Sequence, residues 1–187
     1  FFYRYSNHIS IEKNIMNILI KFLLILFTTF NLYSEYKITV LATNISNYGG
    51  FGEWSFSALY ESENESVLFD TGFHEDTVLH NANVLNKDLS KVNKVVLSHF
   101  HSDHTGGLIK LRKAYKKINK YAFSEVYVAR GFFDQRYAKN GRKEGPGNYQ
   151  DSLEFKKDAE KEGIKFIILD DYKMIANNIY VTGTVER

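Results

Sequence analysis

Three of the chain's six histidines fall within six residues, and this cluster constrains the fold more than any other feature. The segment "LSHFHSDHTGG" spans residues 97–107 and has the pattern His-x-His-x-Asp-His. It follows the apolar run "KVVLS" (94–98), which is typical of a buried strand, and it ends in Gly106 and Gly107, which allow a tight turn into a helix. The sequence therefore predicts a strand, a turn crowded with polar side chains, and a helix in direct succession.

The side chains of this turn are suited to binding metal ions. Histidines two residues apart on a strand end point to the same side, so His99 and His101 can share one divalent ion through their ring nitrogens. Asp103 and His104 follow where the chain turns into the helix and can face a second ion. Mixed imidazole and carboxylate ligands suit zinc and, less often, iron or manganese. Two such ions would activate a shared water molecule for hydrolysis. The alternative interpretation is a polar surface cluster on a loop.

Composition limits the class of protein. With 187 residues the chain is long enough for one globular domain with its own core. It has no cysteine, which excludes disulfides, thiolate metal sites and a cysteine nucleophile. Without residues 1–34 the chain has 21 basic and 21 acidic residues. A neutral domain of this kind gives no reason to expect nucleic acid as a partner.

The N-terminal region resembles a secretory leader. From Met16 the chain has an early Lys21, an apolar run over residues 22–30 and a polar stretch that ends at Ser34. We therefore expect residues 1–34 to comprise upstream sequence and a signal peptide that starts at Met16, with a secreted or periplasmic domain from residue 35 to 187. The apolar run is too short for a stable membrane span. A buried first element and an uncleaved anchor are the alternatives.

Hydrophobic periodicity beyond residue 35 predicts an α/β protein, because strand and helix patterns alternate. The predicted strands are 36–43, 54–61, 66–70, 94–98, 125–129, 165–169 and 178–183. The predicted helices cover residues 75–86, a segment that places Leu108, Leu111, Tyr115 and Ile118 on one face, and a segment from the N-cap Asp151 to Gly163. The polar loop from Gly131 to Gln150 is long enough to be an active-site flap or an insertion.

Several other side chains have simpler interpretations than a functional role. Trp54, Phe56 and Tyr60 are expected in the core, because aromatic residues in strand patterns are mostly buried. His74 is expected on a solvated loop. His80, on the helix over residues 75–86, is expected to face solvent or to pack against a neighbour.

Two of these segments together resemble a known family. "SHFHSDHTGG" is similar to the signature of the metallo-β-lactamase superfamily, and "VLFDTG" (67–72) resembles the first motif of that superfamily. The wider pattern, with "GEWSFSALYE" and "NANVLNKDLSKVNKVVLSHFHSDHTGGL", resembles the branch that includes dihydropterin–ribofuranosylaminobenzene phosphate synthase-like proteins. The resemblance runs from about Tyr36 to the end of the chain. It implies an αββα sandwich in which each half contributes a sheet and flanking helices.

The resemblance also implies roles for individual residues. His99 and His101 would bind the first metal ion, and Asp103 and His104 the second, with zinc expected and iron or manganese as alternatives. Asp103 would also handle a proton during turnover. Asp70 would lie at the sheet edge beneath the site and orient the metal-bearing loop without being a ligand.

The chain departs from the family pattern after His104. The family uses a further histidine, a bridging acid and a last histidine from the second half of the fold, whereas this sequence has no histidine beyond His104. We therefore expect the chain to represent only the first half of the sandwich, truncated at its C-terminal side and inactive by itself. A degenerate site is the alternative.

These features together predict a metal-dependent hydrolase. A metal-activated hydroxide would attack an ester, amide or phosphoester in a small-molecule substrate. One alternative is an iron-dependent oxidoreductase of the same fold, although those enzymes commonly have an acid where this chain has His101. The other alternative is a non-catalytic protein that binds a metal or a ligand with half of the site.

Overall fold

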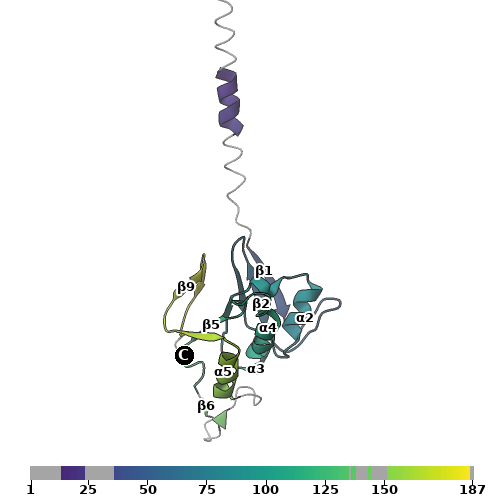
Figure 1. Ribbon diagram of the computed structural model, residues 1–187, viewed down its shortest axis with the longest axis vertical. Coiled ribbons are helices and arrows are strands. Elements are labelled where there is room, and N and C mark those ends of the chain that lie inside the picture. Colours follow the sequence, from purple (N-terminus) through teal and green to yellow (C-terminus); the bar gives the residue numbers. More distant parts are fainter. Residues whose placement is uncertain (1–13, 24–35, 135, 138–142, 145–150, 186–187) are drawn as a thin grey trace, which may run out of the picture. The chain divides into compact units, whose positions relative to one another are not determined.

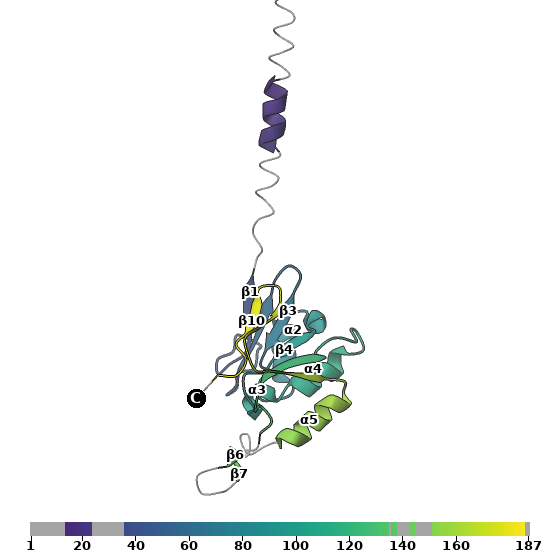
Figure 2. The ribbon, with the colours of Figure 1, turned by 90° about the vertical axis from the view of Figure 1, so that its left-hand side faces the viewer.

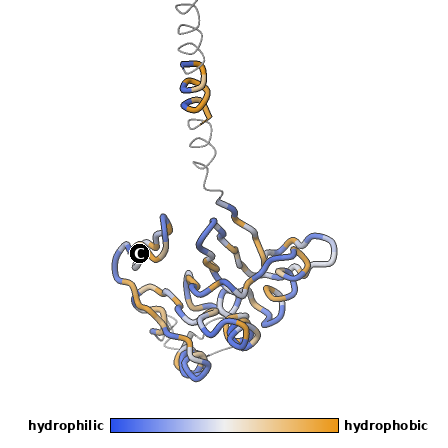
Figure 3. The backbone as a smooth tube through the Cα atoms, turned by 45° about the horizontal axis from the view of Figure 1, so that its top comes forward, coloured by the Kyte–Doolittle hydropathy of each residue, from blue (hydrophilic) through white to orange (hydrophobic). Residues whose placement is uncertain are grey.

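The computed structural model describes residues 14–23, 36–134, 136–137, 143–144 and 151–185. Contacts divide the chain into two units, Phe1–Glu35 and Tyr36–Arg187. In the first unit, residues 14–23 form a helix that is mostly hydrophobic (Figure 3). The predicted leader therefore falls only partly within the described residues. None of the helices in these ranges combines the length and the apolar character needed to cross a bilayer.

The second unit is built on a six-stranded mixed sheet with the strand order β1-β2-β3-β4-β5-β8 (Figure 1). The first three strands are antiparallel neighbours, and the pairs from β3 to β8 are parallel. The strands are β1 (Lys37–Ala42), β2 (Ser57–Glu61), β3 (Ser66–Phe69), β4 (Lys94–Val96), β5 (Glu125–Ala129) and β8 (Lys165–Leu169). Parallel neighbours need crossover connections, and helices supply them here.

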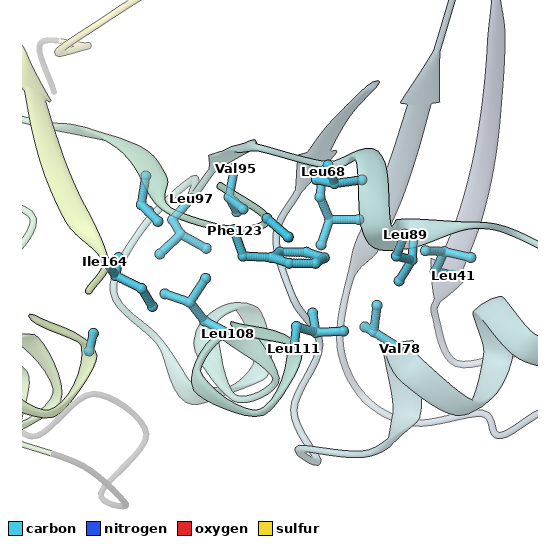
Figure 4. Packing of buried hydrophobic residues seen from close by; sticks show 14 of the residues in the cluster. Leu41, Leu68, Val78, Leu89, Val95, Leu97, Leu108, Leu111, Phe123 and Ile164 are labelled. Atoms are coloured by element: carbon cyan, nitrogen blue, oxygen red, sulfur yellow. The ribbon is translucent and has the colours of Figure 1, made fainter. Parts of the chain in front are cut away.

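Helices α2 (Thr77–Val84), α4 (Leu108–Tyr115) and α5 (Ser152–Lys161) cover one face of this sheet (Figure 2). Their apolar faces and the inward residues of the strands form the main core, in which Phe123 lies between sheet and helix residues (Figure 4). The fully buried members include Leu41, Leu59, Leu68, Val78, Leu89, Val95, Leu108, Leu111, Phe123, Val126 and Phe155. Helix α5 begins at the predicted N-cap, because the Asp151 carboxylate accepts hydrogen bonds from the backbone of Leu153 and Glu154.

A hairpin of β9 (Lys173–Ala176) and β10 (Ile179–Val181) packs on the opposite face. Its residues Ile175 and Ala176 form a second, smaller cluster with Val67, Val96, Tyr127 and Leu169. One sheet with one layer of helices is half of an αββα sandwich. The predicted α/β fold class, first half only, is therefore confirmed.

Most predicted elements are present, and the differences have local causes. Trp54 is 78% exposed, so its predicted place in the core is wrong: β2 begins only at Ser57, and Trp54 lies in the preceding loop. Phe56 and Tyr60 are half-buried. Ile118 is 71% exposed rather than buried, because α4 ends at Tyr115.

The sequence patterns did not predict β9 or the short helix α3 (Ser102–Thr105). The predicted flap from Gly131 to Gln150 lies mostly outside the described residues. Within it, β6 (Arg136–Tyr137) and β7 (Lys143–Glu144) form a two-stranded ribbon.

Candidate metal centre

The histidine cluster lies where two parallel strands end. Asp70 directly follows β3, and the segment from Ser98 to His101 follows β4 and leads into α3. The Asp70 backbone N–H donates to Val96 O over 2.8 Å, so the two chain segments stay side by side beyond the strands. In open α/β sheets, ligands bind at such carboxyl ends.

Asp70 is the buried centre of this site. Its residue is 1% exposed, and its backbone has a φ of 54°, a conformation that aspartate tolerates better than most residues. Its Oδ1 accepts a hydrogen bond from the Ser98 backbone N–H over 2.8 Å. Its Oδ2 accepts from Ser98 Oγ over 2.8 Å and from His104 Nδ1 over 2.7 Å. Asp70 thus joins the turn after β3 to the histidine-bearing segment after β4, and both of its carboxylate oxygens accept hydrogen bonds from protein groups.

The serine hydroxyl determines which nitrogen of His99 is protonated. Ser98 donates its one hydroxyl proton to Asp70, so its oxygen accepts from His99 Nδ1–H over 3.0 Å. The lone pair of His99 is then on Nε2, which lies 2.9 Å from Nδ1 of His101. We call His99 and His101 the imidazole pair.

Asp103 and His104 form the second pair of candidate metal ligands, which we call the mixed pair. His104 Nδ1 is hydrogen-bonded to Asp70, so only its Nε2 can bind a metal ion. This atom lies 3.5 Å from Asp103 Oδ2. The rings of His99 and His104 have centroids 4.3 Å apart. The two pairs are therefore direct neighbours.

The two pairs differ in electrostatics. Burial lowers the pKa of His99, and the neighbouring His104 and His101 lower it further. The hydrogen bond that His104 donates to Asp70 raises the pKa of His104, although partial burial works against this. The neutral form that a metal ligand needs is thus favoured at His99, and the Asp70 carboxylate increases the basicity of His104.

The spacing within each pair is close to that of two ligands on one metal ion. Nitrogens bound to one tetrahedral zinc ion are about 3.3 Å apart. The imidazole pair is 2.9 Å apart and the mixed pair 3.5 Å apart, so each differs from that value by a few tenths of an ångström. In the part of the chain that the structure describes, no group of three or more histidine, aspartate or glutamate side chains is arranged to hold a metal ion. The cluster therefore offers two half-sites.

Gly106 and Gly107 are needed because α3 packs directly on the turn that follows Asp70. A Cβ atom at Gly106 would lie 1.8 Å from Phe73 O, and one at Gly107 would lie 2.4 Å from Thr71 O. Their backbone N–H groups donate to Gly72 O and Thr71 O over 2.9 and 3.1 Å. The segment "LFDTG" and the glycines that follow the histidine cluster thus pack directly against each other.

Sequence reasoning missed Ser98 and Glu53. Ser98 stands inside the histidine motif, so its position was the available signal. No local pattern marked Glu53, whose carboxylate binds the turn at Gly72. His74 is exposed, as predicted, and His80 stacks on the Phe51 ring at 3.8 Å with Nε2 2.7 Å from Gly49 O. Neither histidine joins the cluster.

Comparison with known proteins gives three consistent matches. The family model "Metallo-beta-lactamase superfamily" matches residues 55–171. The 7,8-dihydropterin-6-methyl-4-(beta-D-ribofuranosyl)-aminobenzene-5'-phosphate synthase of Methanocaldococcus jannaschii is 28% identical over 156 residues, which is 80% of this chain and 51% of that protein. An uncharacterized protein of the same organism is 31% identical over 150 residues, 80% of this chain and 54% of that protein.

Among solved structures, a metal-dependent hydrolase of the beta-lactamase superfamily matches with a TM-score of 0.54 and 28% identity. The match covers 80% of this chain and 48% of that one. The chain thus spans about half the length of the relatives that it matches.

Proposed function

Because this chain belongs to the metallo-beta-lactamase superfamily, we propose that it is a metal-dependent hydrolase that binds zinc through the cluster at the ends of β3 and β4. His99 and His101 hold one ion, and Asp103 and His104 hold the second. The remaining ligands of both ions come from outside the cluster. The substrate is a small molecule with an ester, amide or phosphoester bond.

One observation carries this proposal: four candidate ligand atoms face each other in two adjacent pairs, and Asp70 and Ser98 fix the ring protons of His104 and His99 on Nδ1. A solvated loop of histidines would not need a buried carboxylate to fix it. When bound there, divalent metal ions would supply Lewis-acid activation of water and of a substrate oxygen.

The residues of the chain have separate tasks in this proposal. Asp70 keeps Nδ1 of His104 protonated and so leaves its Nε2, beside Asp103, free to bind a metal ion. Ser98 does the same for His99 and its Nε2. Asp103 is half-buried beside His104 and takes up and releases a proton during turnover.

The test compares His101→Ala with His74→Ala in the purified full-length protein. His74 is an exposed histidine near the same turn and serves as the matched control. We expect His101→Ala to lose bound zinc, measured by elemental analysis, and hydrolysis of a panel of aryl esters, amides and phosphodiesters. His74→Ala keeps both. Unchanged metal content and turnover in His101→Ala would show the proposal to be wrong.

The same panel separates the alternatives. Iron in the purified protein with an oxygen-dependent reaction would point to an oxidoreductase. Transfer to an acceptor other than water would point to the kind of reaction that the name synthase of one relative indicates. Bound metal without any turnover would leave a binding protein.

We further propose that residues 16–34 act as a cleaved secretory leader. The support is the early Lys21 followed by an apolar run and a polar end. N-terminal sequencing of the protein exported from a bacterial host tests this. A new N-terminus at Glu35 is expected, and cytoplasmic protein that keeps residues 16–34 would contradict it.

A further inference from the structure

Glu53 lies at the end of the loop between β1 and β2 and binds the turn that follows Asp70. Its Oε1 accepts hydrogen bonds from the Phe73 backbone N–H and from Ser55 Oγ, both over 2.7 Å. Its Oε2 accepts from the His74 backbone N–H over 3.1 Å and from Thr77 Oγ1 over 2.8 Å. Four donors, two of them backbone N–H groups of consecutive residues, thus converge on one half-buried carboxylate.

The turn is shaped to receive this carboxylate. Gly72 has a φ of 75°, and a Cβ atom there would lie 2.8 Å from Glu53 Oε1. Successive backbone N–H groups beside a left-handed residue form a concave anion site. The glycine of "LFDTG" is therefore required both by its backbone conformation and by the close approach of Glu53.

The far side of the same turn holds the metal-ligand helix. Thr71 N–H donates to His104 O over 2.7 Å, and Gly106 N–H donates to Gly72 O over 2.9 Å. The segment that carries Glu53 also reaches α3 directly, because Phe56 N–H donates to Asp103 O over 3.3 Å while Phe56 O accepts from Gly72 N–H. Residues 53–56, the turn Thr71–His74 and α3 are thus hydrogen-bonded to one another. Among the side chains in these contacts that join residues 53–56 to the turn, Glu53 is the only charged one.

We propose that Glu53 is a positioning residue that fixes the turn Thr71–His74 and, through it, the placement of Asp103 and His104. The inference rests on the proposed function in one respect, that Asp103 and His104 bind metal. Glu53 itself contacts neither of them. Its effect is transmitted through backbone hydrogen bonds to the residues of α3, so it acts more strongly on the mixed pair than on the imidazole pair, of which only His101 is joined to α3 as its N-cap residue.

The first experiment needs no metal. We call the four hydrogen bonds that the Glu53 carboxylate accepts the clamp. In the metal-free protein, Glu53→Gln places an amide N–H group against one of the two backbone N–H groups and thereby weakens the clamp. We expect hydrogen exchange of the Thr71, Gly106 and Gly107 amides to become roughly tenfold faster, the loss expected for a bond to a charged group. The amides of Val126 and Val128 in β5 keep their protection. The matched control is Glu61→Gln on β2, which removes a carboxylate that forms an ion pair with Lys87.

If Glu53→Gln is too unstable to measure, Thr77→Val removes a single hydroxyl donor from the clamp while keeping the shape of the side chain. A two- to threefold acceleration at the same three amides is then expected, since one neutral donor is lost. Acceleration throughout the domain, β5 included, would make Glu53 merely structural and overturn the inference. No change at the three amides would overturn it as well.

The second experiment measures zinc binding by calorimetric titration of the same variants. Glu53→Gln is expected to weaken the step that needs Asp103 and His104 by about tenfold, at the lower end of effects seen for residues behind metal ligands. The other step is expected to change much less. Equal weakening of both steps, or of neither, contradicts the positioning role. If the wild-type protein binds no zinc while the exchange result holds, the proposed function fails and the clamp remains.

Discussion

The imidazole pair and the mixed pair lie side by side, yet the chain supports them in different ways. His99 and His101 extend from the end of β4, and the only side chain in the described contacts that fixes either ring from behind is Ser98. Asp103 and His104 begin a short helix that is bonded to the turn Thr71–His74 and to Asp70. His101 is also the N-cap residue of α3, and its carbonyl accepts from the His104 and Thr105 N–H groups. The first pair thus depends on the strand end and the start of α3, and the second depends on three segments distant in sequence.

This difference has a consequence for variants. A change that disturbs packing behind α3 should affect the mixed pair more than the imidazole pair, whereas a change at Asp70 should affect both pairs. A change at Ser98 should affect the imidazole pair alone.

Gly106→Ala should have the largest effect, because the new methyl group would lie 1.8 Å from Phe73 O and backbone has to move. Overpacking of this kind costs about 3 kcal/mol in the free energy of unfolding. Urea denaturation measures the loss. Gly52→Ala, whose nearest contact is Asn44 O at 3.1 Å, is the control and should cost less than about 1 kcal/mol. Similar losses in both variants would refute the close packing of α3 on the turn.

Asp70→Asn should weaken metal binding at both pairs. The amide would oppose a donor at Ser98 or at His104, and an unsatisfied buried polar group costs about 2 kcal/mol. Zinc affinity should fall about 10- to 100-fold for both binding steps in a calorimetric titration. Asp88→Asn serves as control, since Asp88 is a surface N-cap that asparagine can replace. Loss at only one step would show that the two pairs do not share Asp70.

Ser98→Ala should separate the pairs. His99 loses the acceptor for its Nδ1–H, whereas His104 keeps its bond to Asp70. We expect a cost of about 1 kcal/mol in stability. The imidazole step of zinc binding should weaken about tenfold while the mixed step is unchanged. A weakened mixed step would contradict the division.

The smallest effect concerns pH. Burial works to raise the pKa of Glu53, but the hydrogen bonds from Phe73, Ser55, Thr77 and His74 outweigh it and hold the pKa below the ordinary 4.5. The folded state therefore favours the charged form, and this stabilisation is complete above pH 4.5 and disappears as the pH falls through the lower folded pKa. The stability difference between wild type and Glu53→Gln, followed by urea denaturation at several pH values, should shrink on acidification below 4.5. A constant difference would show that the charge of Glu53 is not involved.

The sequence predicted those features that depend on local pattern. The strands β5 and β8 coincide with their apolar runs, and Asp151 caps α5 as its spacing indicates. The donor residues also follow from local spacing, because a strand end and a helix start fix the relative positions of side chains two to five residues apart.

Features that depend on tertiary contact could not be predicted in this way. Trp54 has an aromatic side chain in an alternating pattern and is therefore expected in a strand. Residues 53–56 are instead held against the turn by hydrogen bonds of Glu53 and Phe56, and β2 starts only at Ser57. Ile118 continues the apolar face of α4 beyond the last helical residue. Glu53 acts on residues about twenty positions away, which no short motif can encode.

The most direct test of the proposed metal centre is anomalous diffraction at the zinc absorption edge from crystals of the protein grown with zinc. We expect one anomalous peak within bonding distance of His99 Nε2 and His101 Nδ1, and a second beside Asp103 Oδ2 and His104 Nε2. The two peaks would be close neighbours above Asp70. Zinc bound elsewhere on the chain, with no peak at either pair, would contradict the account.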